Sequence, residues 1–276
     1  MSLSTVASGL GFAEGPTLLQ SGGLAVVSID QQRLYAISAD AHATVLTQMD
    51  AAPNGCTEGP QGALFLAAFS GAWPADPSCK GAPGVYAWAN DEVTVVSAEP
   101  MAPNDLCFGP DGHLYVTDPV RGQAAGRLWR IDIETGVAAL LVTLDWFPNG
   151  IGFDADDNLW VADTAGRRLV RFDGTAVTDP GATIVLPQGR PDGFAFDTTG
   201  SILVGALSTP EHPSSSVLVL DADGALTDVL VDDEGAHHTN VAITSDGTAY
   251  VTEARRGQVL SLDGICAPGL PLHPFR

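Results

Sequence analysis

The sequence predicts an all-β fold, a six-bladed β-propeller with four-stranded blades around a central channel. A motif recurs six times at intervals of about 40–50 residues, alternating apolar segments lie between its copies, and Gly and Pro occur throughout the chain. No segment shows sustained helical periodicity. A pair of β-sandwiches and a seven-bladed ring with one degenerate blade are the alternatives, but the fixed offsets within the motif favour six blades.

Each copy of the motif begins with a polar residue, continues through an apolar stretch and a tight turn, and ends in an apolar strand. The clearest copy, NDLCFGPDGHLYVTD, runs from Asn104 to Asp118. The opening residues of the six copies are Glu14, Asn54, Asn104, Asn149, Asp192 and Thr239. Eight residues after each of them comes a turn position, which is glycine in every copy except the fourth, where it is Asp157. Glycine suits a hairpin turn with positive φ.

Segments with period-two alternation supply the other strands of the blades. They include 33–38, 84–89, 126–132, 167–173, 216–221 and 258–263. The apolar segment Gly136–Leu144 is short and is followed by Asp145, so we also expect it to form a strand. Because a ring of blades offers no linker at which it could be divided, residues 1–276 are expected to form a single propeller domain.

The charge balance narrows the classes of partner. The chain has 33 acidic and 12 basic residues, a formal net charge of −21. Such a surface repels nucleic-acid phosphates and anionic lipids and suits a cation. No apolar run reaches the roughly 18 residues of a membrane-spanning helix, and the first ten residues lack the pattern of a signal peptide. We expect a cytoplasmic protein, monomeric or weakly oligomeric, that binds a small molecule and neither nucleic acid nor membrane.

The opening residues of the six motifs predict a metal site. Equivalent positions of all blades lie on a circle around the propeller axis, so these side chains are expected at the mouth of the channel. All six carry an oxygen, and two are carboxylates. Such a set suits one divalent cation, calcium above all, with zinc, manganese and magnesium as alternatives. The other interpretation is that Asn and Asp cap turns here, although Glu14 is a poor residue for that role.

At these positions the sequence resembles the gluconolactonase/regucalcin (senescence-marker protein) family of six-bladed propellers. The resemblance covers nearly the whole chain and is carried by GFAEGP (11–16), APNDLCFGPDGHLYVTDP (102–119), FPNGIGFDADDNLWVADT (147–164), RPDGFAFDTTG (190–200) and TNVAITSDGTAYVTE (239–253). The resemblance implies that Glu14, Asn104, Asn149 and Asp192 bind the cation. It also implies that Asp192 is the catalytic base.

The activity implied by the resemblance is metal-dependent hydrolysis of a lactone or a similar cyclic ester, in which the cation polarises the carbonyl group. Related propellers of the diisopropyl-fluorophosphatase type use a similar ligand set. Phosphotriester hydrolysis is therefore one alternative, and a calcium-binding propeller without catalysis is another. Family members that act on sugar lactones carry an arginine where this chain has Ala102, which argues against an aldonolactone substrate.

Six side chains are predicted to contact the substrate: Asn54, Trp73, Trp146, His237, His238 and Thr239. Asn54 and Thr239 would orient the substrate or a water molecule. Trp146 and the two histidines are expected near the rim, where aromatic groups suit a substrate less polar than a sugar. Each histidine is either a proton shuttle or hydrogen-bonding group, or a solvated loop residue. Trp73 lies in an insertion, 70–84, that would form a lid over the mouth or an excursion into solvent.

Overall fold

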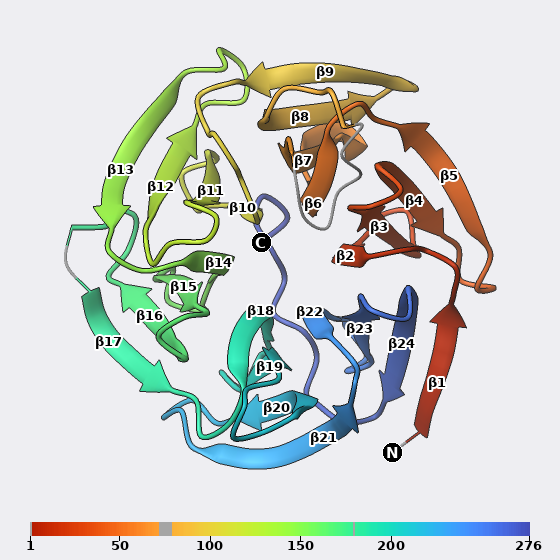
Figure 1. Cartoon of the computed structure of the whole chain (residues 1–276), viewed down its shortest axis with the longest axis vertical. Helices are drawn as coiled ribbons and strands as arrows, with labels where there is room; N and C mark the ends of the chain where they lie inside the picture. Colours follow the sequence, from red (N-terminus) through yellow and green to blue (C-terminus); the bar gives the residue numbers. More distant parts are fainter. Residues whose placement is uncertain (1, 72–78, 179) are drawn as a thin grey trace.

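Six four-stranded antiparallel sheets surround a common axis (Figure 1). The computed structural model describes residues 2–71, 79–178 and 180–276. The predicted all-β fold with six blades is confirmed. Within these ranges the single helical element is a 3-10 turn at Pro60–Gly62, so no helix described here is long or apolar enough to cross a bilayer.

Each blade is built from the axis outward. The innermost strands are β2 (Ala13–Leu18), β6 (Ala52–Glu58), β10 (Leu106–Phe108), β14 (Pro148–Phe153), β18 (Arg190–Phe196) and β22 (His238–Ile243). The second strands are β3 (Leu24–Ser28), β7 (Leu64–Phe69), β11 (Leu114–Pro119), β15 (Leu159–Asp163), β19 (Ile202–Leu207) and β23 (Ala249–Glu253). The third strands are β4 (Arg33–Ile37), β8 (Gly84–Ala89), β12 (Gly126–Ile131), β16 (Arg168–Phe172), β20 (Ser214–Leu220) and β24 (Gln258–Asp263). The outermost strands are β5 (Ala43–Gln48), β9 (Glu92–Ser97), β13 (Ala138–Leu144), β17 (Pro180–Val185), β21 (Leu226–Glu234) and β1 (Ser2–Ala7).

The strands predicted from alternating segments are confirmed as the third strand of each blade, and the strand predicted at Gly136–Leu144 is β13. The predicted turn positions have φ values between 61° at Asp157 and 91° at Gly22. They lie at the end of each blade where the innermost strand turns back into the second strand. The six motifs are therefore equivalent in space as well as in sequence.

Strands from both ends of the chain share one blade. β1 pairs antiparallel with β24 and forms the outer edge of the sheet whose other strands are β22, β23 and β24. In Figure 1 this is the blade where red meets blue. Hydrogen bonds between sequence-distant strands thus close the ring.

The apolar core lies between neighbouring blades. In one cluster Tyr115 and Leu128 of the third blade pack with Leu159 and Phe172 of the fourth. Second strands such as β3 are buried along their whole length because neighbouring blades cover both faces of the sheet. Each fully buried leucine or phenylalanine contributes about 1.5–3 kcal/mol. The blades are therefore held mainly by packing of their faces, which fixes the innermost strands around the axis.

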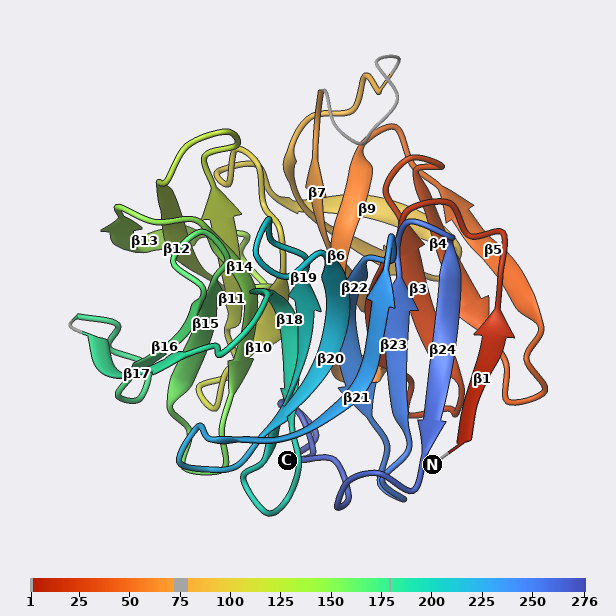
Figure 2. The same ribbon diagram turned by 60° about the horizontal axis from the view of Figure 1, so that its bottom comes forward.

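The C-terminal segment crosses the end of the channel opposite the opening residues (Figure 2). Gly269 forms an isolated bridge with Asp197, and the amide of Leu270 donates to the carbonyl oxygen of Phe196 at 2.9 Å. His273 Nε2 lies 3.0 Å from the Oδ1 atom of Asp157. These contacts join the segment to the turns of two blades, and Figure 1 places its end at the centre of the ring. The C-terminal segment therefore lies away from the mouth where the opening residues are, and that mouth is the candidate position for a site.

Candidate functional site

The opening residues lie where the innermost strands depart from regular pairing. In five blades the register between the innermost and second strands shifts at this position, for example between Pro148 and Ile151 of β14. Asn104 lies just before β10, and its backbone N–H donates to the carbonyl oxygen of Thr117 at 2.8 Å. Such bulges change the direction of side chains and are common beside functional sites. Here the bulges allow two successive residues of a strand to face the axis.

The structure brings the six opening residues together as a buried ring, from 1% exposed for Thr239 to 9% for Asp192. Neighbours in the ring contact one another. Asn54 Nδ2 donates to Asn104 Oδ1 at 2.8 Å. Thr239 hydrogen-bonds the carboxylate of Glu14, and Asn149 hydrogen-bonds that of Asp192. These contacts join the six residues in three pairs, and the charges of Glu14 and Asp192 repel each other across two of the pairs.

The orientation of the Asn149 amide follows from its partner. Thr164 Oγ1 donates its only proton to the carbonyl oxygen of Pro191 at 2.7 Å, so it can only accept from Asn149 Nδ2, which lies 3.0 Å away. The amide oxygen of Asn149 is left for a ligand. Thr117 supports the same strand, because its Oγ1 donates to the carbonyl oxygen of Asn149 at 2.7 Å.

Burial and repulsion by neighbouring carboxylates raise the pKa values of the two carboxyl groups in the ring. Burial, followed by repulsion from Asp192, raises the pKa of Glu14 well above its usual value. Burial and then repulsion from Asp105 raise the pKa of Asp192 to about 7. Both acids would ionise more readily beside a cation.

Asp105 is a third buried carboxyl group that the sequence reasoning missed. Burial raises the pKa of Asp105 to about 6. It follows the opening residue Asn104, a position occupied by glycine in four of the other copies and by Asn240 in the sixth. Asn240 Nδ2 contacts Asp105 Oδ2 at 3.5 Å, so these two residues meet from opposite blades. The departure from glycine at this position was the signal that could have revealed Asp105.

Glycine at this position leaves room for the neighbouring strand. A Cβ added to Gly150 would lie 2.5 Å from the carbonyl oxygen of Asp192 and 2.8 Å from the Cα of Gly193. We expect Gly150→Ala to push β18 away, to lower activity by about 100-fold through misplacement of Asp192, and to destabilise the fold by about 1–3 kcal/mol. Activity assays and thermal unfolding measure both effects.

Gly152→Ala is the matched control in the same strand. A Cβ at Gly152 would lie 3.5 Å from its nearest neighbour, an atom of the Phe194 ring, which is an ordinary contact. Equal losses in the two alanine variants would contradict the role assigned to the close approach at Gly150.

The donor set fits a hard divalent cation. Among the residues that the structure describes, no group of three or more His, Cys, Asp or Glu side chains is arranged to hold a metal. The ring instead combines the carboxylates of Glu14 and Asp192 with amide oxygens of Asn104 and Asn149. Oxygen ligands of this mixed kind are those that calcium takes, and two carboxylates balance its charge. The absence of sulfur and imidazole from the ring favours calcium over zinc.

Two predicted substrate contacts lie instead in the interior of the blades. Trp146 packs with Leu128 and Leu144 in the apolar core. His238 is fully buried, and its Nδ1 lies 3.1 Å from the carbonyl oxygen of Ser215. Their positions, three and one residues before an opening residue, direct them away from the axis.

The other predicted contacts have different surroundings. His237 is half-buried, and its ring packs edge-to-face against Phe12, with the ring centroids 6.4 Å apart. Burial lowers the pKa of His237. Trp73, with residues 72–78 of the predicted insertion, lies outside the described residues. Asn54 and Thr239 reach Asn104 and Glu14 rather than open solvent.

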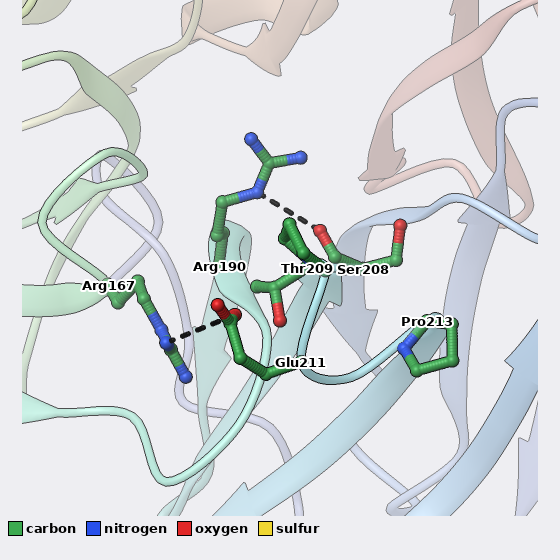
Figure 3. Close-up of a pocket in the computed structure, with 7 residues that line it drawn as sticks. Arg167, Arg190, Ser208, Thr209, Glu211 and Pro213 are labelled. Carbon is green, nitrogen blue, oxygen red and sulfur yellow. Dashed lines mark hydrogen bonds and ion pairs between the residues drawn. The ribbon is translucent and has the colours of Figure 1, made fainter.

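An open groove of about 670 Å³ lies at the loops of the fourth and fifth blades (Figure 3). It is lined by Arg167, Arg190 and the loop 208–213. Arg190 Nε donates to the carbonyl oxygen of Ser208 at 3.1 Å, and Figure 3 shows the rest of its guanidinium directed away from that bond. Of the residues that line the groove, Arg190 lies nearest in sequence to an opening residue, two positions before Asp192.

The fold and the ring together define a class: six-bladed propellers with an oxygen-rich, acidic site at the mouth of the channel. The chain belongs to the SMP-30/gluconolactonase/LRE-like family, whose model matches residues 12–255. No curated protein matches the chain in a sequence search.

Solved structures with this fold include a gluconolactonase from Xanthomonas campestris (20% identity, TM-score 0.77, covering 97% of this chain and 89% of that one). Regucalcin from Agrobacterium tumefaciens, described as a calcium-binding protein, is similar at 21% identity and a TM-score of 0.75, covering 99% of this chain and 96% of that one. A luciferin-regenerating enzyme is similar at 15% identity and a TM-score of 0.77, covering 98% of each chain. At these identities the similarity shows a shared fold.

Proposed function

We propose that the protein is a metal-dependent hydrolase that opens a lactone or a similar cyclic ester. The observation that carries this proposal is the ring itself, in which Glu14 and Asp192 are buried together with amide oxygens at the open mouth of the channel. The family contains gluconolactonases by its own description, and one similar structure is a gluconolactonase. A similar calcium-binding protein supports calcium as the cation.

Four residues would hold the cation: Glu14, Asn104, Asn149 and Asp192. When bound there, a divalent cation supplies Lewis-acid polarisation of the ester carbonyl and stabilises the negative charge that develops on its oxygen. Asn54 keeps the amide of Asn104 in place through its 2.8 Å hydrogen bond. Thr239 positions the carboxylate of Glu14 in the same way.

Asp192 is the general base in this proposal. Its carboxylate takes a proton from the attacking water while the water oxygen bonds to the carbonyl carbon. The C–O bond of the lactone ring then breaks, and Asp192 transfers the same proton to the departing alkoxide oxygen. Without a cation, burial and repulsion from Asp105 raise the pKa of Asp192 to about 7, so its carboxyl group is only partly ionised at neutral pH. A bound cation shifts that pKa downward, so the base is ionised at neutral pH.

The test is a panel of lactones, linear esters and phosphotriesters, assayed after chelation and again with added calcium, zinc, manganese or magnesium. We expect lactone hydrolysis that chelation abolishes and calcium restores. Hydrolysis of phosphotriesters alone would replace the proposal with the rival reaction. Absence of any turnover with saturating calcium bound would indicate a binding protein.

A further inference from the structure

One guanidinium group at the mouth has hydrogen-bonding capacity that the described residues do not use. Arg121 lies two residues after the end of β11, in the loop to β12 on the face that carries the ring. Its Nε and Nη2 atoms are buried and have no hydrogen-bond partner within the described ranges. Its Cζ atom lies 4.0 Å from the centroid of the Phe69 ring, and this stacking holds the guanidinium in place.

Arg121 is not paired with the acidic residue nearest to it in sequence. The carboxylate of Asp118 accepts from Trp129 Nε1 at 2.9 Å and from the amide of Ala102 at 2.8 Å, and it forms an ion pair with Arg127 at 2.9 Å. Burial lowers the pKa of Arg121 to about 10, so the group stays charged at neutral pH. A buried charge with unpaired donors is costly for a fold to keep.

The charge of Arg121 interacts with the two carboxylates of the ring. The carboxylates of Asp192 and Glu14 attract its charge and oppose the effect of burial on its pKa. A divalent cation held by Glu14 and Asp192 would neutralise those two charges. The unpaired donors of Arg121 would then be the cationic group available to a substrate at the mouth.

Three carboxylates lie beside the positions that come two residues before the opening residues, since Asp30, Asp118 and Glu253 accept from the backbone amides of Phe12, Ala102 and His237. The residues two positions before the opening residues are Phe12, Ala52, Ala102, Phe147, Arg190 and His237. Ala102 packs in the same cluster as Phe69, so its small side chain leaves space where the Arg121 guanidinium stacks. None of these six residues is itself acidic, and they include two phenylalanines and one arginine.

The basic residues of the chain are concentrated on this face, although the chain as a whole is strongly acidic. Those in the loops and strand ends on the ring side are Arg33, Lys80, Arg121, Arg127, Arg167, Arg168, Arg190, Arg255 and Arg256. Of the 12 basic residues only Arg130, Arg171 and Arg276 lie elsewhere. This distribution favours approach of an anion to the mouth over approach to the opposite face.

We propose that the substrate carries a free carboxylate and that Arg121 binds it, so the enzyme prefers lactones of acidic compounds over neutral ones. A planar guanidinium with two unpaired donors matches the two oxygens of a carboxylate. This proposal rests on the lactone hydrolysis proposed above. Arg121 is the specificity-determining residue, and Asp192 remains the base.

The test compares 5-oxotetrahydrofuran-2-carboxylate with its neutral carboxamide, two lactones of nearly equal size. We expect wild-type kcat/KM to be about 10–100-fold higher for the carboxylate, since a hydrogen bond to a charged group is worth roughly that factor. Arg121→Gln is expected to remove the preference, so that the kcat/KM values for the carboxylate and the carboxamide become nearly equal. Arg255→Gln, which removes the same charge from the same face, is the matched control and is expected to keep the preference.

Two further measurements separate this inference from lactone hydrolysis and from a structural role. Tetrahydrofuran-2-carboxylate has no ester, so calorimetry measures its binding without turnover, against tetrahydrofuran-2-carboxamide. Arg121→Met retains the bulk on Phe69 and removes the unpaired charge, so its Tm is expected to equal or exceed that of the wild type.

The outcomes are distinct. No carboxylate preference in the wild type, a preference that survives Arg121→Gln, or an equal loss in Arg255→Gln would each overturn the proposal. A lower Tm in Arg121→Met with the preference intact would assign Arg121 to the fold instead. If both lactones are inert but the wild type binds tetrahydrofuran-2-carboxylate in preference and Arg121→Gln does not, the role of Arg121 stands and lactone hydrolysis fails.

Discussion

Asp192→Asn is expected to lower kcat for lactone hydrolysis by about 10²–10⁴-fold at saturating cation, the usual contribution of a positioned acid–base group. Asparagine keeps the size of the side chain and one oxygen that can face a cation, but it does not accept the proton of the attacking water at neutral pH. The loss should therefore appear in kcat more than in cation affinity. Steady-state kinetics and calorimetric titration with calcium measure these two quantities separately.

Asp228→Asn is the control for this substitution. Asp228 lies exposed on β21, the outermost strand of the same blade, so its replacement changes the net charge equally and leaves the ring intact. Full activity of Asp192→Asn on every lactone that the wild type hydrolyses would refute the assignment of the base.

Calcium is expected to raise the Tm much more at pH 8 than at pH 5. In the unfolded chain these carboxyl groups titrate near pH 4, whereas in the fold the pKa of Asp192 is raised to about 7 and that of Glu14 is also raised. The folded protein therefore binds protons that the unfolded chain has lost, and its stability without cation falls as the pH rises from about 4 through 7. Calcium competes with those protons, so it binds best where they are absent.

The size of this effect follows from linkage. A cation at 100 times its Kd stabilises the fold by about 2.7 kcal/mol, which raises the Tm of a chain of this size by on the order of 5–10 °C. Thermal unfolding at both pH values, with calcium or with chelator, measures it. Glu14→Gln should raise the Tm at pH 8 without cation and abolish the response to calcium. An equal response at pH 5 and pH 8, or a wild-type response in Glu14→Gln, would contradict the proposed site.

The fold could be predicted because its information is local and repeated. Each hairpin needs a residue that tolerates positive φ, and each blade needs alternating strands, so six copies at constant offsets predict six equivalent units. The position of Glu14 and Asp192 in one ring follows from that equivalence alone. The C-terminal segment across the far end of the channel has no repeat and no alternation, so nothing in its sequence predicts where Leu270 or His273 lies.

The rest of the site depends on side-chain direction and on loops. A bulge breaks the period-two rule, so strand alternation could not show that His238 faces the blade interior beside Thr239. Asp105 lies just before β10, where no alternation indicates direction, and only its departure from glycine distinguishes it in the sequence. Arg121 lies in a loop, where no periodicity indicates direction. Its role emerges only from the stacking on Phe69 and from the partners that Asp118 already has.

The pairing of β1 with β24 has a consequence for biosynthesis. β1 is made before its partner β24 and stays unpaired until Gln258–Asp263 have been made, so this blade can assemble only after the other five blades have been synthesised. Once β24 has been made, and until β1 of the same molecule pairs with it, its edge is open to the β1 strand of another copy. An exchange of β1 between two molecules would satisfy every hydrogen bond of that pairing. We therefore expect intertwined dimers, if they form at high concentration during refolding, to be joined at this blade.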